Sequence, residues 1–254
     1  MKTLLLAVFC FFVVMPCAAF AESDIMVEFE GRYWFTDLTA EVKVTQDDIG
    51  SDIDLQSDLG VDDKDFPEGR FTWYINANNR LRLSYMQIDY SGDQELQRTL
   101  EFNGGTYPAG ARVITDFEVK YLRFGWIWQF VNLASGKIKF GTLLEAKGVS
   151  ADATLKSPDV SLKKSDDLIA GLPTIGIVVD ISPLDIITIF GEVSGMPAGK
   201  YGYFFDAEAG IKIIPIKNLS ILGGYRYFDI KAEDDPDFAK VRISGPFVGA
   251  TVRF

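Results

Sequence analysis

Histidine is absent from the 254-residue chain, and cysteine occurs only at Cys10 and Cys17. Both cysteines fall in an N-terminal segment that we expect to be removed, so the mature chain should contain neither residue type. The absence of cysteine excludes disulfides, thiolate metal sites and cysteine nucleophiles. The absence of histidine excludes imidazole general bases and histidine-ligated metals. Few enzymatic mechanisms are possible for a chain that has neither cysteine nor histidine.

Long apolar runs and positive charge are also scarce. Beyond the N-terminal segment, no apolar run approaches the roughly 20 residues that a membrane-spanning helix needs. The net charge is −11, and it becomes −12 once Lys2 is lost with that segment. Nucleic-acid binding requires clustered lysine and arginine to displace counterions, so the acidic balance argues against it. Hydrophobic residues still make up 48% of the chain, which is high for an acidic protein.

The N-terminus has the three parts of a secretory signal peptide. A short basic stretch at residues 1–3 precedes an apolar stretch at 4–15, and residues 19–21 form a small-x-small cleavage site. The apolar stretch is too short for a retained transmembrane helix. We therefore expect a signal peptide at 1–21 and a mature chain of residues 22–254.

Strand-like alternation of apolar and polar residues recurs along the mature chain. Asparagine, glycine and proline mark tight turns between the alternating segments. Ten segments have this pattern, at residues 25–36, 67–75, 80–90, 112–130, 137–149, 167–181, 185–195, 201–216, 219–230 and 239–254.

The connections between these segments alternate between short and long. Outer-membrane barrels have short periplasmic turns and longer extracellular loops, and two periplasmic termini require an even number of strands. The barrel must also close, because an open edge would leave backbone groups unpaired in lipid. The sequence therefore predicts an all-β fold, a closed antiparallel transmembrane β-barrel of about ten strands, with eight or twelve as alternatives. A soluble β-sandwich would leave the signal peptide and the turn asymmetry as coincidences.

The alternation also assigns side chains to the two faces of the wall. In the first segment Phe29 and Tyr33 are expected to face lipid, and Glu28 and Arg32 to face inward. In 112–130 the same reasoning places Phe117, Val119 and Tyr121 outside and Asp116, Glu118 and Lys120 inside. The pattern slips before Phe124, Trp126, Trp128 and Phe130, and a β-bulge near Tyr121 and Leu122 would explain the slip.

The last strand ends on an aromatic residue. Val248, Ala250, Val252 and Phe254 alternate with a mixed face. A terminal aromatic on an alternating strand resembles the C-terminal signature that outer-membrane barrels present to their insertion machinery. We therefore expect Phe254 to be the insertion signal, with outer-membrane lipids, lipopolysaccharide and that machinery as partners.

Five short motifs follow one another along the mature chain, at residues 58–63 with 67–70, 81–85, 102–108, 223–226 and 249–254. In the order of these motifs the whole mature chain resembles a family of uncharacterised outer-membrane β-barrel proteins of Gram-negative bacteria. The resemblance implies a fold and a location, and it carries no catalytic residues. We therefore expect residues 22–254 to form a single outer-membrane β-barrel domain.

The predicted lumen is lined by charges of both signs. Barrels near eight strands have interiors that side chains nearly fill, whereas water-filled porins use about 16–18 strands. We favour a paired network that plugs the lumen, and the alternative is a narrow, charge-lined pore for ions or small molecules. The predicted lumen charges are Glu28, Glu30, Arg32, Arg70, Arg82, Asp116, Glu118, Lys120, Glu145, Lys147, Glu192, Asp206, Glu208, Lys212 and Arg226.

The first long loop is strongly acidic. Carboxylate clusters suit hard cations such as Ca²⁺, which could link the loop to phosphates of surface lipopolysaccharide. We favour a solvated loop that resists aggregation, with no metal and no cofactor. The weak metal candidates are Asp52, Asp54, Asp58, Asp62 and Asp63.

Function is predicted less sharply than location. Known small outer-membrane barrel hydrolases and acyltransferases resemble one another in relying on a histidine, so we expect no enzyme. The leading expectation is a structural or envelope-maintenance role. The alternatives are the narrow channel and a surface binding or adhesion module that uses the acidic loops. Pro173 lies inside a predicted strand and cannot donate a ladder hydrogen bond, which indicates either a bulge or a lateral opening for a small apolar molecule.

Overall fold

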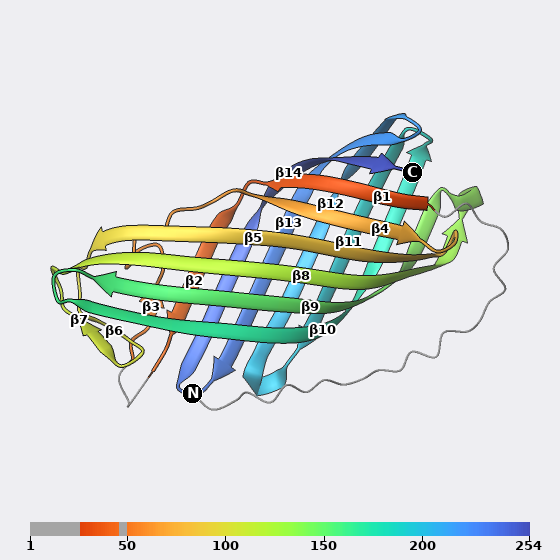
Figure 1. The fold of residues 1–254 in the computed structure, drawn as a ribbon. Helices are drawn as coiled ribbons and strands as arrows, with labels where there is room; N and C mark the ends of the chain where they lie inside the picture. The colour runs from red at the N-terminus through yellow and green to blue at the C-terminus, as the bar shows by residue number, and fades with distance from the viewer. Residues whose placement is uncertain (1–25, 46–49) are drawn as a thin grey trace.

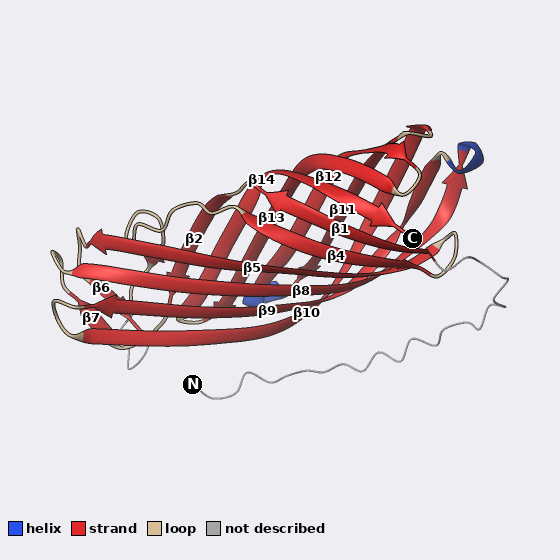
Figure 2. Cartoon of the chain, turned by 45° about the horizontal axis from the view of Figure 1, so that its top comes forward, coloured by secondary structure: helices blue, strands red, loops and turns tan. Residues whose placement is uncertain are grey.

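The computed structural model describes residues 26–45 and 50–254. The predicted signal peptide at 1–21 therefore lies outside the described residues. No helix in the described ranges has the length and apolar character needed to cross a membrane. The chain is built almost wholly from β-strands, with two short 3-10 turns at Ala134–Gly136 and Gly199–Tyr201 (Figure 2).

Ten antiparallel strands close into a barrel, which confirms the predicted fold class. Each strand pairs with the next one in the barrel, and β1 pairs with β14 to complete the ring (Figure 1). The barrel strands are β1 (Met26–Trp34), β4 (Phe66–Tyr74), β5 (Asn79–Glu95), β8 (Arg112–Leu133), β9 (Ile138–Ser157), β10 (Leu162–Leu184), β11 (Ile187–Pro197), β12 (Gly202–Ile216), β13 (Leu219–Asp234) and β14 (Asp237–Arg253).

The two ends of the barrel differ, but less in connection length than predicted: only the connections from β1 to β4 and from β5 to β8 are long, and the loop-end connections at 158–161, 198–201 and 235–236 are short. At one end, here called the turn end, neighbouring strands are joined by tight turns, and Val27 exchanges two backbone hydrogen bonds with Phe254. The opposite end is called the loop end. There the strands are longer than predicted, because β9 and β10 take up most of the predicted loop at 150–166.

Four short strands complete the loop end. β6 (Leu100–Phe102) and β7 (Gly105–Tyr107) form a hairpin inside the connection from β5 to β8. β2 (Asp37–Lys43) continues the line of β1 along β14, and β3 (Ile53–Asp54) pairs with β2.

A seam between β2 and β5 is sealed by loop residues instead of a strand. Strand β4 begins at Phe66, which lies opposite Trp34 at the end of β1, so no part of β4 runs beside β2. Asp63 and Asp65 accept hydrogen bonds from the backbone N–H groups of Leu38 (2.7 Å) and Thr36 (3.0 Å). These carboxylates satisfy backbone donors that a missing strand would otherwise leave unpaired.

The polarity of the wall reverses along each long strand. On β5, the outward Leu83 and Tyr85 are 43% and 46% exposed, and the inward Arg82 is buried. Further toward the loop end the outward Asp89 is exposed and the inward Ile88 is buried. The turn-end half therefore has an apolar outside suited to lipid, and the loop-end half has an apolar inside suited to water.

This reversal corrects the prediction for residues 112–130. Strand β8 keeps one phase past Tyr121, which is buried, while Leu122 and Phe124 face outward. The predicted bulge at Tyr121–Leu122 was therefore wrong; the irregularity in pairing lies between Trp128 and Val131. The apolar belt is the band of outward-facing apolar side chains in the turn-end half of the barrel, and on β8 it ends near Leu122. Beyond that point the outward side chains of β8 are mostly polar and the inward ones are mostly apolar, which produces the apparent slip.

We expect single-cysteine variants to locate the edge of the belt. The mature chain offers a cysteine-free background. Glu118 and Phe124 lie on the same outward face of β8, so Glu118→Cys should react quickly with a water-soluble maleimide in lipid vesicles or micelles, and Phe124→Cys slowly. Mass spectrometry over time gives both rates. Faster labelling of Tyr121→Cys than of Glu118→Cys would restore the slipped phase and contradict the reversal.

Candidate functional site

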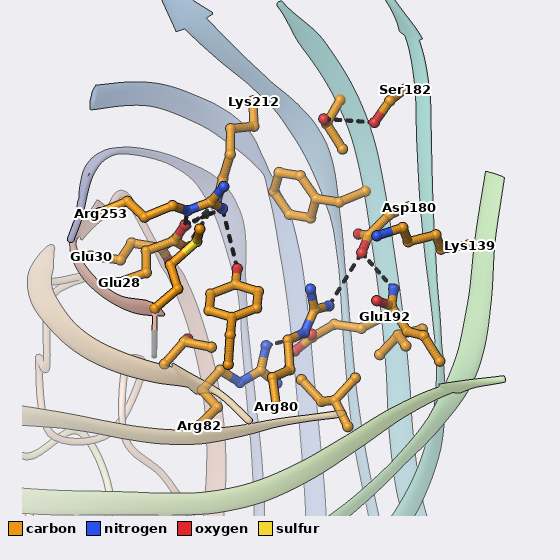
Figure 3. A pocket seen from close by; sticks show the side chains of 18 of the residues that line it. Glu28, Glu30, Arg80, Arg82, Lys139, Asp180, Ser182, Glu192, Lys212 and Arg253 are labelled. Atoms are coloured by element: carbon orange, nitrogen blue, oxygen red, sulfur yellow. Dashed lines mark hydrogen bonds and ion pairs between the residues drawn. The ribbon is translucent and has the colours of Figure 1, made fainter. Parts of the chain in front are cut away.

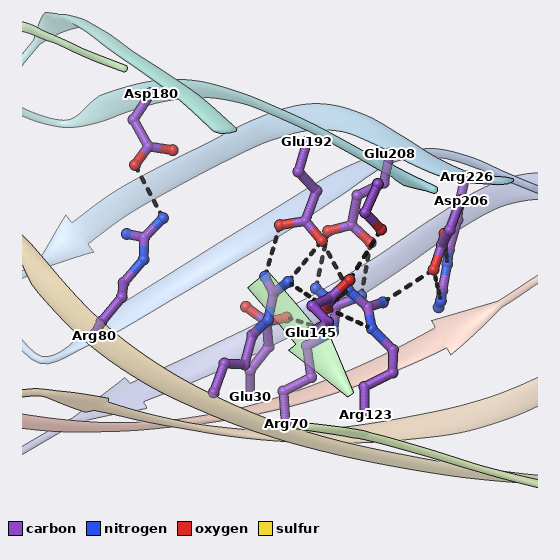
Figure 4. A network of polar contacts seen from close by, with 12 residues as sticks. Glu30, Arg70, Arg80, Arg123, Glu145, Asp180, Glu192, Asp206, Glu208 and Arg226 are labelled. Atoms are coloured by element: carbon purple, nitrogen blue, oxygen red, sulfur yellow. Dashed lines mark hydrogen bonds and ion pairs between the residues drawn. The ribbon is translucent and has the colours of Figure 1, made fainter. Parts of the chain in front are cut away.

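A balanced layer of charged side chains crosses the lumen at the middle of the barrel (Figure 4). Six basic and six acidic residues form it, and no side chain among them is more than 11% exposed. Such charges are tolerated away from water only when they are paired. This lumen charge layer consists of Glu30, Arg32, Glu68, Arg70, Arg82, Arg123, Glu145, Lys147, Glu192, Asp206, Glu208 and Arg226.

Each arginine on one side of the layer is held between two carboxylates. Arg226 donates to Asp206 at 2.9 and 3.0 Å and to Glu68 at 3.1 Å. Arg70 donates to Glu208 at 2.6 and 2.8 Å, and also to Glu68 at 2.9 Å. These contacts join β4, β12 and β13, so the layer links opposite walls of the barrel with charge-assisted bidentate hydrogen bonds.

The other side of the layer is centred on β5, β8 and β9. Arg82 donates to Glu192 at 2.7 and 2.8 Å, and Arg123 donates to Glu145 at 3.0 Å and to Glu192 at 2.9 Å. Lys147 lies 3.0 Å from Glu145. Every carboxylate in this part of the layer has a basic partner.

An aromatic layer lies directly against the charges on the loop side. Lys147 Nζ is 4.3 Å from the ring centre of Phe204, and the guanidinium carbon of Arg226 is 4.9 Å from that of Trp34. Arg32 contacts Phe247 in the same way at 4.4 Å. These cation–π contacts join two stacked layers that together fill the lumen. The aromatic layer comprises Trp34, Tyr121, Phe204, Phe228 and Phe247.

A vestibule of about 520 Å³ lies on the turn side of the charge layer (Figure 3). Glu28 binds Lys212 at 3.0 Å and Arg253 at 2.7 Å, and Arg80 lies 3.3 Å from Asp180. The inner end of the vestibule is formed by members of the charge layer. The vestibule is therefore a charged cavity that is bounded on its inner side by the charge layer.

Most of the predicted lumen charges do meet in the lumen. Three do not: the side chains of Asp116, Glu118 and Lys120 face outward on the part of β8 beyond the apolar belt, and Glu118 pairs there with Lys120. Their predicted lumen position was wrong because the polarity of β8 reverses. The structure places the other twelve inside, at Glu28, Glu30, Arg32, Arg70, Arg82, Glu145, Lys147, Glu192, Asp206, Glu208, Lys212 and Arg226.

Sequence reasoning missed two members of the charge layer. Glu68 lies two residues before Arg70 on β4 and therefore on the same face, so strict alternation would have found it. Arg123 was obscured by the supposed bulge next to it. The terminal Phe254 faces outward, 68% exposed, with its ring 6.3 Å from that of Phe29.

The acidic loop residues are engaged mainly in local contacts. Asp58 is bound by Arg98 at 2.5 Å, Asp52 lies 3.3 Å from Lys43, and Asp54 accepts two hydrogen bonds from the turn that follows it. Partial burial opposes ionisation of Asp58, but its hydrogen bonds from Arg98 and the Asp54 backbone outweigh that and lower its pKa. Within the described ranges, no group of three or more acidic side chains is placed to hold a metal ion.

Comparison with solved structures supports the fold. The chain is similar to the outer-membrane protease OmpT of Escherichia coli, with a TM-score of 0.59 and 6% identity over 91% of this chain and 99% of that one. Ail of Yersinia pestis, in complex with a heparin analogue, matches with a TM-score of 0.42 and 13% identity, covering 91% and 100%. The Neisserial surface protein NspA gives 0.36 and 14%, covering 91% and 98%.

The likeness to OmpT supports an outer-membrane-type β-barrel fold and nothing finer. No family model and no curated protein sequence matches the chain. The resemblance to one particular uncharacterised family therefore stays a prediction.

Removing one arginine from the charge layer should destabilise the barrel strongly. Arg226→Met removes the bidentate partner of Asp206 and one of the arginines that bind Glu68, and we expect a loss of roughly 3–5 kcal/mol in unfolding free energy. Arg112→Met is the matched control, because Arg112 pairs with Asp93 on the exposed surface and its loss should change little. Urea titration in vesicles, followed by tryptophan fluorescence, measures both. Equal losses would show that the layer has no special role in stability.

Proposed function

We propose that the chain is a non-enzymatic, non-conducting integral barrel of the outer membrane with a structural or envelope-maintenance role. The observation that carries this proposal is the double barrier in the lumen. The charge layer links opposite walls, and the aromatic layer stacks on it with Trp34, Phe204 and Phe247 all at most 3% exposed. A channel would need a continuous polar path, and this arrangement argues against one.

The absence of enzymatic activity is part of the same proposal. The chain contains no histidine, and the carboxylates of the charge layer are held by arginine and lysine. OmpT is described as a protease, but at 6% identity its likeness extends to the fold alone. We accordingly extend its architecture to this chain and not its activity.

Orientation and partners follow from the asymmetry of the two ends. We propose that the turn end, where β1 begins and Phe254 lies, faces the periplasm, and that the loop end faces the cell exterior. The apolar belt would contact outer-membrane lipids and lipopolysaccharide, and Phe254 would be read by the insertion machinery. The exposed acidic residues of the loop end would meet divalent cations only at the cell surface.

A surface-binding role is the second candidate. The observation that favours it is the height of the wall formed by β5, β8, β9 and β10 at the loop end. Strand β8 has 22 residues and β10 has 23, whereas a transmembrane strand needs roughly 9–11. The remaining residues of these strands form a broad folded surface outside the apolar belt, and a surface of this kind is suited to binding a partner.

Single-channel recording in planar bilayers tests the proposal. We expect refolded, heat-modifiable protein to give no current steps. The double variant Arg82→Ala, Arg226→Ala removes two bridges of the charge layer and should leak measurably more current than the parent. The surface variant Arg112→Ala is the control and should remain silent.

Two outcomes would count against the proposal. Stable, reproducible steps from the unchanged protein would make it a channel. A double variant that stays folded and alters ion preference without raising the current would also indicate an open, narrow pore. Heat-modifiable migration on a gel shows in each case that the barrel is folded.

A further inference from the structure

Among the described residues, strand β10 has one long edge with no strand paired to it. It pairs with β9 from Leu162 to Ile181, but its pairing with β11 begins only at Ile175. β11 ends at Pro197, so β10 continues beyond it toward the loop end with a paired strand on one side only, although the β6–β7 hairpin contacts this part of β10. In Figure 1, β10 is the last of the long front strands; its left half has β9 above it, and the short β6–β7 hairpin lies below its left end.

The backbone groups of this edge point away from β9 at alternate residues. Asn103 Nδ2, from the β6–β7 turn, donates to the backbone oxygen of Ser165 at 2.9 Å. In an antiparallel strand the N–H and C=O of one residue face the same neighbour, so Ser165 turns both groups away from β9. Its oxygen is already bonded to Asn103, and an added strand would have to displace that side chain to use it. With an uninterrupted register, Lys163 and Asp167 also turn both groups away from β9.

An open edge of this kind is a template for an added strand. The outward side chains of Lys163, Ser165 and Asp167 are exposed, and Ile169 is 73% exposed. Pro173, which has no N–H, lies just where β11 stops pairing and pairs with Ala146 of β9. Pro173 therefore marks the end of the open edge that lies toward the turn end of the barrel.

The charge pattern along the open edge of β10 indicates which sequence an added strand would need. Residues 162–168 read Leu-Lys-Lys-Ser-Asp-Asp-Leu, which is symmetric about Ser165 with opposite charges at equal distances. An antiparallel strand with the same order would place an acidic residue opposite each lysine and a basic residue opposite each aspartate. Opposite charges that face each other across strands stabilise the pairing.

We propose that the open edge of β10, residues 162–172, docks an extended peptide segment of a partner protein. The segment would run antiparallel to β10 and carry two basic residues, one spacer and two acidic residues. A second copy of this chain in the same membrane is disfavoured. Its β10 would point the same way relative to the bilayer, whereas antiparallel pairing needs the opposite direction. This proposal is independent of whether the lumen conducts.

The test uses the full mature chain in detergent micelles and a fluorescent synthetic peptide with the sequence of residues 160–170. We expect saturable binding by fluorescence anisotropy, together with slower hydrogen exchange at Lys163, Ser165 and Asp167. A scrambled peptide of the same composition is the control. No saturable binding to heat-modifiable protein at millimolar peptide would overturn the proposal.

A charge swap tests the register. The variant Lys163→Asp, Asp167→Lys should bind the original peptide roughly tenfold more weakly, because two attractive cross-strand pairs become repulsive. The same swap made in the peptide should restore binding to the variant and weaken it with the parent. Equal binding in all four combinations would overturn the proposed pairing, whatever the affinity.

Backbone involvement is tested by Ser165→Pro, which removes an edge N–H without removing a hydrogen bond to β9. We expect it to abolish peptide binding while the barrel stays heat-modifiable. Unchanged peptide binding would overturn strand addition. Light scattering supplies a further check: a dimer of the protein alone that Ser165→Pro dissolves would show that a second copy, and not a partner peptide, occupies the edge.

Discussion

The pairing of buried charge is the constraint on which the rest of the structure depends. A barrel of ten strands places its inward side chains close enough to touch across the lumen, and a charge there must find a partner. Six basic and six acidic groups meet this requirement together. Their bonds join strands that are distant in sequence, such as β4 to β13 through Glu68 and Arg226. The layer therefore ties the barrel wall across its diameter, and it provides the flat charged surface on which Trp34, Phe204 and Phe247 rest.

Two solvents shape the two halves of the same wall. Inside the apolar belt, lipid selects hydrophobic side chains outside and leaves the polar ones for the lumen. Beyond the belt, water surrounds the wall, and the hydrophobic side chains turn into a core of the soluble type, with Ile88 and Leu100 nearly inaccessible. The alternation of inward and outward side chains continues from the lipid-facing half into the water-facing half without a shift of one residue. Paired charges occupy the middle of the lumen and packed apolar side chains occupy its loop-end half, while the vestibule lies on the turn side of the charges.

Much of this architecture could be predicted from the sequence, because the period of two, the tight turns and the unequal connections are all local signals. Ten strands and the outward faces of Phe29 and Tyr33 followed from them and agree with the structure. Alternation reports the contrast between two faces, and it does not say which solvent lies outside. That is why Asp116 was assigned to the wrong side and the strand ends were read as loops. Partner choice within the charge layer, such as Arg226 with Asp206, depends on the register between strands, which no single segment encodes.

We infer that paired charges across the lumen hold the barrel closed. A double-mutant cycle between Arg70 on β4 and Glu208 on β12 tests this most directly, with unfolding free energies measured in lipid vesicles for the parent, Arg70→Met, Glu208→Gln and the combined variant. We expect a coupling energy of about 2 kcal/mol or more, near the upper end for residues in direct contact. A coupling energy near zero, with additive losses, would contradict it and would mean that the layer fills space without tying the walls together.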